Sequence, residues 1–307
     1  MRYNPTVLRR VLRYATRRDV RRQPLRLFAR RARFELARRR GGEAVSRDRV
    51  ARFGDGLQIG IRFDDKIERA IYLYGVYENL STVAFLSLVQ KGGTVVDAGA
   101  HVGHYTLLAA ERVGPSGRVI AFEPDPRNRV RLERNVERNA LDHVEVLPFA
   151  VFDREATLPF VTAPDGNTGL GSLAPEAAAA AATVRTVRID DVLEQRGIER
   201  VDVVKLDVEG FEAPALEGAA QLLERSRPAV LFEVNRLDGE HGMVTAPAID
   251  ALRRHGYRVY AIEARGGRSG FGLMELEPGA DPRPYAERWY SLNLVALHPG
   301  GVHKTLR

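Results

Sequence analysis

The chain has 307 residues, with 47 lysines and arginines, 40 aspartates and glutamates, and no cysteine. This length suits one large α/β domain or two small domains. The lack of cysteine excludes a disulfide framework, a thiolate zinc site and a cysteine nucleophile. No apolar stretch reaches the roughly 18 residues that a membrane-spanning helix needs, and no apolar signal region follows the N-terminal arginines. A soluble, cytoplasmic protein is expected.

Positive charge is concentrated near the N-terminus. Residues 1–40 contain 15 arginines and two acids and carry a net charge of +13, which leaves −6 for the rest of the chain. Apolar residues recur at helical spacing from Val7 to Ala15, which predicts a basic helix. This arm could be a solvated or disordered extension, or it could bind the inner membrane surface, where each arginine is worth about 1 kcal/mol. Nucleic acid and a protein partner are less favoured, because aromatic residues are sparse in the arm.

Periodicity divides the chain into three regions. An Arg-rich arm over residues 1–48 precedes a preamble over 49–92, with short strand-like pieces at 57–63 and a helical run at 78–90. Over residues 93–307 strands and helices alternate, which predicts an α/β domain with a parallel sheet and crossover helices. The preamble is expected to pack on this domain.

The elements of the larger domain follow one another with one interruption. Residues 162–184 are rich in Gly, Asn, Ser and Ala, and are expected to form a surface loop or a mobile loop beside an active site. The last apolar runs, 257–263 and 291–297, should form an antiparallel pair that closes one edge of the sheet. The other strands are expected at 94–98, 118–123, 144–149, 202–207 and 228–234, and the helices at about 103–112, 126–139, 212–224 and 246–255.

The segment VVDAGAHVG, at 95–103, is the most informative motif. A buried strand ends at Asp97, and Gly99 and Gly103 allow the backbone to turn tightly and to approach a ligand. Glu123 ends the next strand, 24 residues beyond Gly99, where an acid can accept both hydroxyls of a ribose. The turn and the acid together predict a cofactor of the adenosine type.

The same segment argues against NAD. The dinucleotide fingerprint G-x-G-x-x-G begins with glycine, whereas Asp97 stands at that position here. A carboxylate there disfavours a pyrophosphate with its two negative charges. It suits a ligand with an ammonium group and a positively charged sulfur. The expected cofactor is therefore S-adenosyl-L-methionine.

A second charged cluster, KLDVEGFE at 205–212, follows another apolar strand. Asp207 and Glu209 should emerge at the carboxyl edge of the sheet, where they could position a substrate hydroxyl, accept its proton or hold a divalent ion. Alternatively, one of the acids Glu209, Glu212 and Asp207 could cap the next helix, which is worth about 0.3–1 kcal/mol. Lys205 is expected to point to the other side of its strand and to pair with a carboxylate. Glu233 ends the next strand and could join Asp207, since adjacent strands lie about 4.8 Å apart.

The histidines offer further candidates for a general base. They form no HExxH pair, so zinc is not expected, and a divalent metal held by the acids is left open rather than predicted. His101 lies in the glycine turn, His104 begins the next helix and His241 follows the fifth strand. Each could act as a base with a pKa near ~6.5, although a lone histidine is more often structural. No G-x-S-x-G elbow occurs, which argues against an α/β serine hydrolase.

These segments together resemble the FkbM-type S-adenosylmethionine-dependent methyltransferases. The resemblance runs from about residue 77 to 260 and leaves out the arginine arm. It implies a class I methyltransferase with an α/β, Rossmann-like fold: a mostly parallel seven-stranded sheet, helices on both faces and an antiparallel last strand. The segments that carry it are VDAGAHVG at 96–103, AFEP at 121–124, KLDVEGFE at 205–212 and RPAVLFE at 227–233.

The resemblance also implies roles by position. Tyr77 and Glu78 match an aromatic–acid pair that is frequent upstream of the turn, and Asp207 and Glu209 would line the site. His101 stands where the family usually has asparagine, so backbone contacts carry over whereas a side-chain amide contact does not. The residues expected at the cofactor are Glu78, Asp97, Gly99, His101, Gly103, Glu123 and Asp207.

The implied reaction is methyl transfer to a hydroxyl of a sugar, a glycolipid or a polyketide-type molecule. The substrate oxygen would attack the sulfonium methyl in line, and alignment would supply most of the acceleration. A base would add roughly 10²–10⁴-fold. Two other interpretations stay open: a nucleic-acid methyltransferase guided by the arm, and a non-catalytic cofactor-binding module. The candidate catalytic residues are Asp207, Glu209, His101 and His241.

Overall fold

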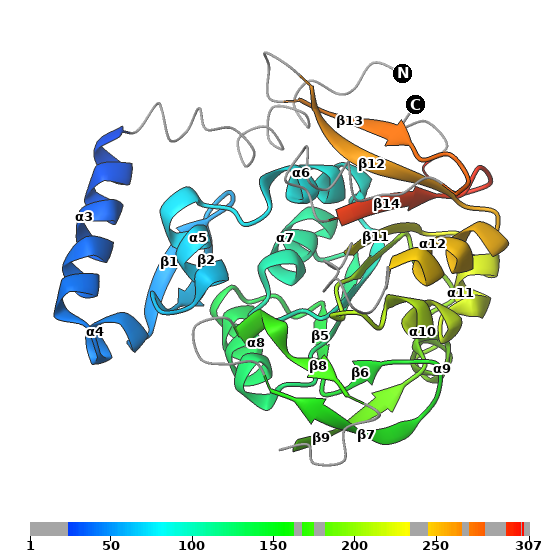
Figure 1. Ribbon diagram of the computed structural model, residues 1–307, viewed down its shortest axis with the longest axis horizontal. Coiled ribbons are helices and arrows are strands. Elements are labelled where there is room, and N and C mark those ends of the chain that lie inside the picture. Colours follow the sequence, from blue (N-terminus) through cyan, green and yellow to red (C-terminus); the bar gives the residue numbers. More distant parts are fainter. Residues whose placement is uncertain are drawn as a thin grey trace.

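An eight-stranded sheet forms the centre of the computed structural model (Figure 1). The structure describes residues 24–162, 168–174, 182–233, 245–265, 270–279, 293–301 and 303. The strand order is β13-β12-β14-β11-β10-β3-β4-β5. The strands from β5 to β11 run parallel, and β14 runs antiparallel to both of its neighbours. The strands are β3 (Thr94–Ala98), β4 (Arg118–Phe122), β5 (Val144–Leu147), β10 (Val203–Leu206), β11 (Ala229–Glu233), β12 (Arg258–Arg265), β13 (Gly270–Glu275) and β14 (Asn293–Leu297).

This sheet confirms the expected fold class, with one strand more than expected. The two last apolar runs form β12 and β14, which pair antiparallel as expected. The additional strand is β13, which folds back on β12 so that Gly270 lies opposite Arg265. It comes from a glycine-rich stretch whose sequence has no clear periodicity, so the pattern did not indicate a strand there.

Helices cover both faces of the sheet (Figure 1). Successive side chains of a strand point to opposite faces, so Val95 packs with α6 and α7, whereas Val96 packs with α9, α11 and α12. None of the described helices is long and apolar enough to cross a bilayer. One face carries α6 (Asn79–Leu88), α7 (His104–Val113) and α8 (Pro126–Arg138), and the other carries α9 (Ile189–Gln195), α10 (Glu212–Glu217), α11 (Ala220–Arg225) and α12 (Thr245–Arg254).

The helix expected over 212–224 is divided into α10 and α11. Gly218 lies between them, and a Cβ atom at this position would collide with the backbone oxygen of Phe152. The carboxylate of Asp190 accepts hydrogen bonds from the N–H groups of Gln221 and Leu222, at 3.0 and 2.9 Å. These bonds satisfy donors in the first turn of α11 and so fix a new helix start.

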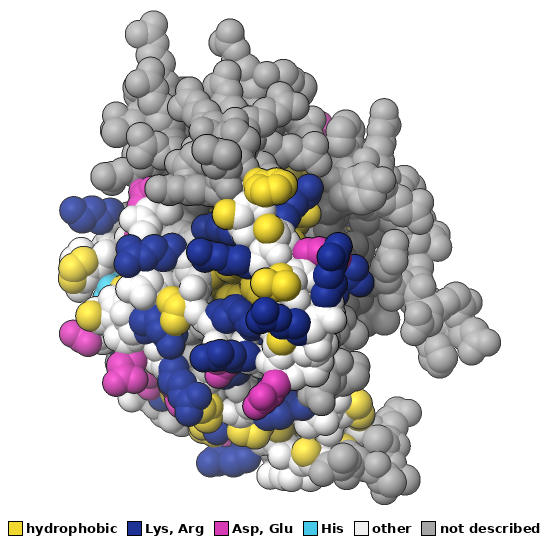
Figure 2. Space-filling view, turned by 90° about the vertical axis from the view of Figure 1, so that its left-hand side faces the viewer, with side chains coloured by type: hydrophobic (Ala, Val, Ile, Leu, Met, Phe, Trp, Pro, Cys, Tyr) yellow, Lys and Arg dark blue, Asp and Glu magenta, His cyan; other side chains and the backbone are white. Residues whose placement is uncertain are grey.

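Residues 24–74 form a layer beside α8. The N–H group of Gly60 donates to Oδ1 of Asn135 at 2.7 Å, which fixes β2 to α8. Phe34 of α3 packs edge-on against Phe63, with ring centroids 5.5 Å apart. Figure 2 looks at this side of the molecule, where basic side chains gather. The elements are α3 (Pro24–Arg40), α4 (Glu43–Ser46), β1 (Arg49–Phe53), β2 (Leu57–Ile61) and α5 (Lys66–Tyr74).

A second, four-stranded sheet was not expected from the sequence. Its strand order is β6-β9-β7-β8, and it includes the described part of the segment 162–184. Two of its strands have only two residues, which is too short for an alternating pattern to be recognised. The elements are β6 (Ala150–Val151), β7 (Ala156–Val161), the 3₁₀ turn η1 (Thr168–Leu170), β8 (Ser172–Leu173) and β9 (Ala182–Val187).

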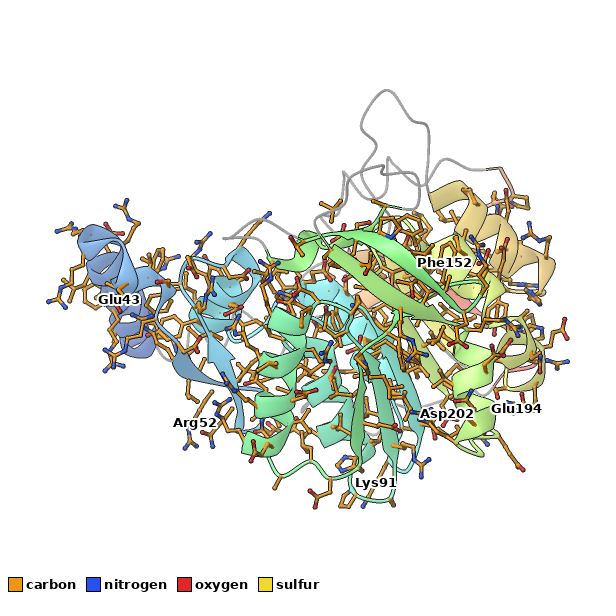
Figure 3. The ribbon with its side chains drawn as sticks, turned by 90° about the horizontal axis from the view of Figure 1, so that it is seen from below. Glu43, Arg52, Lys91, Phe152, Glu194 and Asp202 are labelled. Carbon is orange, nitrogen blue, oxygen red and sulfur yellow. The ribbon has the colours of Figure 1, made fainter. Side chains whose placement is uncertain are left out.

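The two ends of the central strands carry different residues. Lys91 and Asp202 precede β3 and β10 and mark the amino ends of these strands (Figure 3). Oδ2 of Asp202 accepts a hydrogen bond from the N–H group of Thr94 at 2.9 Å, so it joins two strand beginnings. The residues singled out in the sequence follow the strands instead. Ligands of open parallel sheets bind at that carboxyl edge.

Candidate cofactor and catalytic site

The turn between β3 and α7 is closed by backbone contacts. The N–H groups of Gly99 and Ala100 both donate to the carbonyl oxygen of Phe122, at 3.0 Å each. Gly99 has a φ of +76°, and a Cβ atom on it would collide with the backbone oxygen of Asp207. Gly103, which precedes α7, also has a positive φ, of +98°. Glycine alone meets both conditions at position 99, and the turn directly contacts the segment after β10.

His101 lies inside this turn with a φ of +53°, a conformation that side chains with a Cβ rarely adopt. Its N–H group donates to Oε2 of Glu123 at 2.7 Å, and its Nε2 lies 2.7 Å from Oγ1 of Thr168. Burial lowers the pKa of His101 to about 4, against the opposing effect of Asp65. The ring is therefore neutral at pH 7 and holds the turn in place. Its roles at the cofactor and as a base stay predictions.

Glu123 lies beside the turn, where the sequence places a ribose acceptor. Its side chain is only 5% exposed, and its Oε1 accepts a hydrogen bond from the N–H group of Asp125 at 2.9 Å. Burial raises the pKa of Glu123 to about 7. Each carboxylate oxygen can accept more than one hydrogen bond, so the group keeps capacity for a hydroxyl. Its contact with the cofactor stays a prediction.

Lys205 is a buried cation among the acids of the site. It is 2% exposed, and its Nζ lies 3.0 Å from Oδ2 of Asp207 and 3.2 Å from the backbone oxygen of Gly99. The expectation that Lys205 points to the other side of its strand is wrong, whereas its expected pairing with a carboxylate is confirmed. Side chains two residues apart in a strand share a face, so Lys205 and Asp207 lie on the same side.

Asp97 lies beneath the turn and is fully buried. Its Oδ2 accepts a hydrogen bond from Oγ1 of Thr106 at 2.6 Å, whereas its Oδ1 has no hydrogen-bond partner among the described residues. The nearest cation is Lys205, whose Nζ lies 3.8 Å from Oδ1. Burial raises the pKa of Asp97, and Lys205 opposes this only in part. An acceptor without a donor suits an ammonium or hydroxyl group of a cofactor, and that contact stays a prediction.

Three carboxyl groups gather at the ends of β10 and β11. Asp207, Glu209 and Glu233 each offer an oxygen within 4.8 Å of the others, which confirms that Glu233 joins Asp207. Such a set could hold a hard cation, although Lys205 already lies against it. Of the acids considered for a cap at α10, Glu212 makes hydrogen bonds there: its Oε1 accepts from the N–H groups of Val208 and Gly210, at 3.1 and 3.4 Å.

The pKa values of this trio are displaced in different directions. Burial raises the pKa of Asp207, but Lys205 outweighs it and holds that pKa below its usual range. Burial and the neighbouring Asp207 raise the pKa of Glu209 to about 8 and that of Glu233 well above its usual range. Asp207 is thus the ionised member, and the trio titrates as a unit.

Glu78 reaches the same site from the start of α6. Its Oε2 accepts hydrogen bonds from Oη of Tyr105 at 3.0 Å and from Nδ2 of Asn293 at 2.9 Å. Burial, and then the charge of Asp207, raise its pKa to about 7. The pairing with Asn293 joins residues far apart in the chain and has no local motif that could have indicated it. The role of Glu78 at the cofactor stays a prediction.

The described part of the segment 162–184 lies against the glycine turn. Thr168 donates to Oδ2 of Asp65 through both its N–H group and its hydroxyl, at 2.9 Å each, and accepts from Nδ2 of Asn128 at 2.9 Å. Its hydroxyl also contacts the ring of His101. Of the two expectations for this segment, the structure favours the loop beside the site. The partners of Thr168 could not be predicted from sequence, because they come from three separate parts of the chain.

The other histidines with predicted roles differ in placement. His104 is buried, with its Nε2 3.2 Å from Oγ1 of Thr82 and its ring 5.7 Å from that of Phe53. Burial lowers the pKa of His104 to about 3. It is therefore a neutral side chain of the core, which is the structural alternative for this residue. His241 lies outside the described residues.

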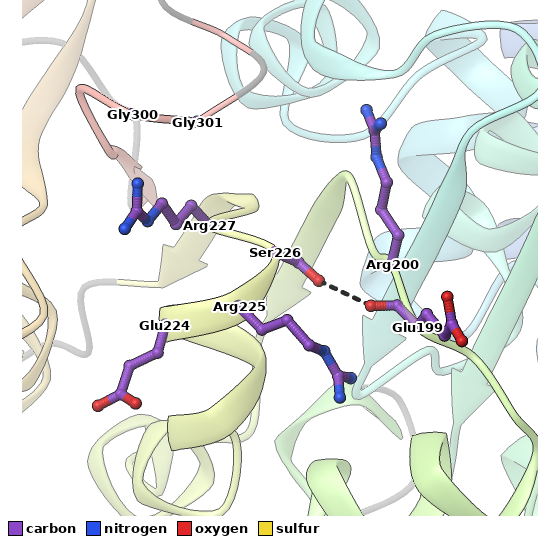
Figure 4. A pocket seen from close by; sticks show the side chains of 8 residues that line it. All are labelled: Glu199, Arg200, Glu224, Arg225, Ser226, Arg227, Gly300 and Gly301. Carbon is purple, nitrogen blue, oxygen red and sulfur yellow. Dashed lines mark hydrogen bonds between the residues drawn. The ribbon is translucent and has the colours of Figure 1, made fainter.

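A hollow of about 730 Å³ lies at the opposite, amino edge of the sheet (Figure 4). It holds charged side chains of both signs, and its wall includes a hydrogen bond from Oγ of Ser226 to the backbone oxygen of Glu199 at 3.3 Å. None of the residues predicted for the cofactor or for catalysis lines it. The candidate site is therefore the carboxyl edge. The residues that line the hollow are Glu199, Arg200, Glu224, Arg225, Ser226, Arg227, Gly300 and Gly301.

The turn, Glu123 and the acid trio fall within a segment that matches a known domain. Residues 97–259 match the methyltransferase FkbM domain. The chain belongs to the FkbM methyltransferase family. The family expected from the sequence is confirmed, and the described carboxyl edge is the corresponding edge of its methyltransferase domain.

Curated relatives share this region at modest identity. The chain is 30% identical over 209 residues to the AMB antimetabolite synthetase AmbE of Pseudomonas aeruginosa, covering 56% of this chain and 10% of that protein. It is 29% identical over 203 residues to the 31-O-demethyl-FK506 methyltransferase FkbM of Streptomyces tacrolimicus, covering 56% of this chain and 75% of that protein. The chain thus spans a tenth of the first relative and three quarters of the second.

A solved structure of a methyltransferase FkbM from Methylobacillus flagellatus overlaps this chain with a TM-score of 0.42 and 15% identity. The overlap covers 72% of this chain and 56% of that one.

Proposed function

We propose that the chain is an S-adenosyl-L-methionine-dependent O-methyltransferase that methylates a hydroxyl of a sugar, a glycolipid or a polyketide-type small molecule. The observation that carries this proposal is the excess of carboxyl groups around one buried lysine at the carboxyl edge. Lys205 balances Asp207, while burial, and then the negative charge of Asp207, raise the pKa values of Glu78, Glu209 and Glu233. A ligand with two positive groups would relieve this imbalance.

The placement of the residues suggests how the cofactor would be held. The backbone of the turn at Gly99 and the carboxyl group of Glu123 would take the adenosine end, as in other strand–turn–helix nucleotide sites. The orphaned Oδ1 of Asp97 and the carboxylate of Asp207 would face the positive groups. Glu78 would complete this acidic wall from the other side. The bound cofactor would supply an electrophilic methyl group.

The residues of the chain would then orient and deprotonate the acceptor. Asp207 is ionised and lies within reach of Glu209 and Glu233, so the trio can accept the proton that a hydroxyl loses as its oxygen forms the new bond to carbon. Holding the acceptor oxygen in line would supply the larger part of the acceleration. The printed name of the Streptomyces relative, a 31-O-demethyl-FK506 methyltransferase, supports oxygen as the acceptor atom.

The test is cofactor binding followed by methyl transfer. Calorimetry with S-adenosyl-L-methionine should give a binding isotherm, and labelled cofactor should pass its methyl group to one member of a panel of sugars, glycolipids and polyketide alcohols. Asp207→Asn should abolish transfer. A matched control is Asp142→Asn, an acid outside the site. Absence of cofactor binding by the folded chain would exclude the proposal, and transfer to amines or RNA alone would exclude the acceptor class.

A further inference from the structure

Helix α3 has two opposite apolar faces. One face packs on the protein: Ala37 is buried and the ring of Phe34 contacts Phe63. The other face is exposed, with Phe28 73% and Leu36 51% accessible. Phe28 and Leu36 are two helical turns apart, and Ala32 lies between them, so the three side chains form one stripe. A helix anchored by one face thus presents a second apolar stripe outward.

Arginines flank this outward stripe. The helix contains seven arginines and one glutamate, a net charge of +6. That glutamate, Glu35, is already paired with Arg38 at 2.6 Å. Figure 2 looks at this side of the molecule and shows basic side chains gathered over it, with apolar side chains between them. Apolar residues interleaved with arginines on an exposed helix are typical of binding at a membrane interface.

The basic surface continues next to α3. Nη2 of Arg30 donates to the backbone oxygen of Arg52 at 3.3 Å, which places β1 beside the helix. Arg52 and Glu43, from the short helix α4, lie at the same end of the molecule (Figure 3). On β1 the side chain of Val50 is exposed as well. Basic side chains of α3 and β1 therefore lie side by side, next to an exposed apolar side chain of β1.

A hollow between β1 and α8 supplies a place for an anionic group. Its volume is about 170 Å³. Arg131 is neutralised by the buried Glu68, and both terminal nitrogens of Arg49 donate to the backbone oxygens of Arg47 and Ala44. The positive charge that the hollow offers to an anion therefore comes chiefly from Arg134 and Arg138. Planar guanidinium groups bind phosphate oxygens in pairs. The lining residues are Asp48, Arg49, Val50, Gly60, Arg131, Arg134, Asn135 and Arg138.

We propose that the outward stripe of α3 and the arginine-lined hollow beside β1 dock the protein on an anionic lipid bilayer, with a lipid phosphate in the hollow. Arginine charge alone would suit RNA equally well. The exposed Phe28, Leu36 and Val50 favour the bilayer, because apolar side chains gain free energy at the lipid interface and gain none beside a phosphate backbone. The proposal is independent of the reaction at the carboxyl edge.

Vesicle flotation of the full chain tests the docking surface. Vesicles with about a third phosphatidylglycerol should carry the protein upward, and pure phosphatidylcholine vesicles should not, with weaker flotation at high salt. Phe28→Ser combined with Leu36→Ser should weaken partitioning about tenfold or more. The matched control is Val161→Ser on β7, whose side chain is 51% exposed like that of Leu36. Equal losses in both variants would overturn the proposal.

Charge reversals test the hollow separately. Arg134→Glu with Arg138→Glu should reduce binding to anionic vesicles about tenfold or more. Arg225→Glu with Arg227→Glu changes the net charge equally at the amino-edge hollow, and should have a much smaller effect. Equal effects would mean that net charge alone drives binding and would overturn the proposal. RNA binding that survives the Phe28 and Leu36 changes, with no vesicle binding, would overturn it in favour of nucleic acid. Circular dichroism confirms that each variant folds.

Discussion

The buried charges of the carboxyl edge depend on single residues. Lys205 contacts Asp207 and the backbone of Gly99 and lies near Asp97, so one ammonium group serves the glycine turn, β3 and the end of β10 together. Removing one partner of a buried ion pair leaves the other charge without compensation in a medium of low polarity. Lys205 therefore links the stability of the domain to the charge state of its candidate site.

We expect Lys205→Met to lower the free energy of unfolding by about 3–5 kcal/mol, because the fully buried Asp97 and the partly buried Asp207 would lose their shared cation. Urea denaturation measures the change. Lys91→Met is the control, since Lys91 is an exposed lysine in the turn before β3. Unfolding midpoints that differ little between the two variants would contradict this view of Lys205.

Gly99 gives a second prediction, based on the shape of the turn. Gly99→Ala should abolish cofactor binding and destabilise the fold by clearly more than 1 kcal/mol, because its Cβ atom would collide with the backbone of Asp207. Gly114→Ala is a matched control: Gly114 has a similar φ of +68° but open space around it, so it should lose only about 1 kcal/mol. Calorimetry and urea denaturation measure both effects, and similar losses would contradict the steric explanation.

Contacts of the site could be predicted where each residue ends a recognisable strand, and could not be predicted where the two residues lie far apart in the chain without such a pattern. Asp207 and Glu233 each end an apolar strand, so their meeting at one edge followed from pattern and topology alone. Lys205 was assigned to the wrong side, although the period of two already places it with Asp207. The contact of Glu78 with Asn293 could not be predicted, because it depends on where β14 enters the sheet.

Among whole elements, the segment around η1 and β8 connects most directly to the site. Thr168 joins it to α5, to α8 and to the glycine turn through Asp65, Asn128 and His101. Thr168 thereby attaches the start of the segment to the turn, while β8 is held by its pairing with β7 and by the hydrogen bond from Oγ of Ser172 to the backbone oxygen of Glu209 at 3.0 Å. Its position predicts that the segment contributes to acceptor binding.

Thr168→Val should loosen this segment, because the valine side chain has a similar volume but forms no hydrogen bond with Asp65 or with the ring of His101, and only the backbone N–H bond to Asp65 remains. Leaving a buried polar group without its partner costs about 1–3 kcal/mol. Hydrogen–deuterium exchange over residues 168–173 should rise strongly. Thr186→Val, a buried threonine of the same sheet, is the control and should leave that exchange unchanged. Unaltered exchange in Thr168→Val would contradict the proposed attachment.

The elements that the sequence predicted well are those buried on both faces. The continuous apolar runs of β3 and β4 can only be central strands once helices alternate with them. The division of the helix over 212–224 depends on a close backbone approach at Gly218, which composition does not reveal. The sheet formed by β6 to β9 could not be predicted, because short strands that pair with distant partners show too little alternation of apolar and polar residues.

For the molecule as a whole, the raised pKa values determine how stability varies with pH. Glu78 and Glu123 have pKa values of about 7 and Glu209 of about 8, against an ordinary 4.5. The folded protein therefore keeps protons that the unfolded chain has already lost, so the free energy of unfolding falls as the pH rises through this range. The pKa of His101 is lowered to about 4, so this residue makes the free energy of unfolding rise with pH, but only below pH 6.5, its ordinary pKa.

We expect the thermal unfolding midpoint of the protein without cofactor to fall between pH 6.5 and about 8, where these carboxyl groups ionise. Scanning calorimetry at several pH values measures it. In Glu78→Gln the slope should be shallower, because one titrating group is gone. A midpoint that rises over this interval would contradict the assignment of protonated carboxyls.

Cofactor binding should be coupled to the ionisation of the same carboxyl groups. A positively charged ligand lowers the pKa of neighbouring carboxyl groups, so binding should release protons and affinity should increase from pH 6 to 8. The observed binding enthalpy should then differ between phosphate and Tris buffers, which have different heats of ionisation. Identical enthalpies in the two buffers would show that no proton is released.

The position of β14 has a consequence for biosynthesis. This strand lies between β11 and β12 although it follows both in the chain, and it begins with Asn293, which contacts Glu78. On the ribosome, β12 and β13 must wait as an unattached hairpin until the nascent chain has been extended past residue 297. The central sheet and its carboxyl edge are therefore completed in the same step, when β14 is inserted.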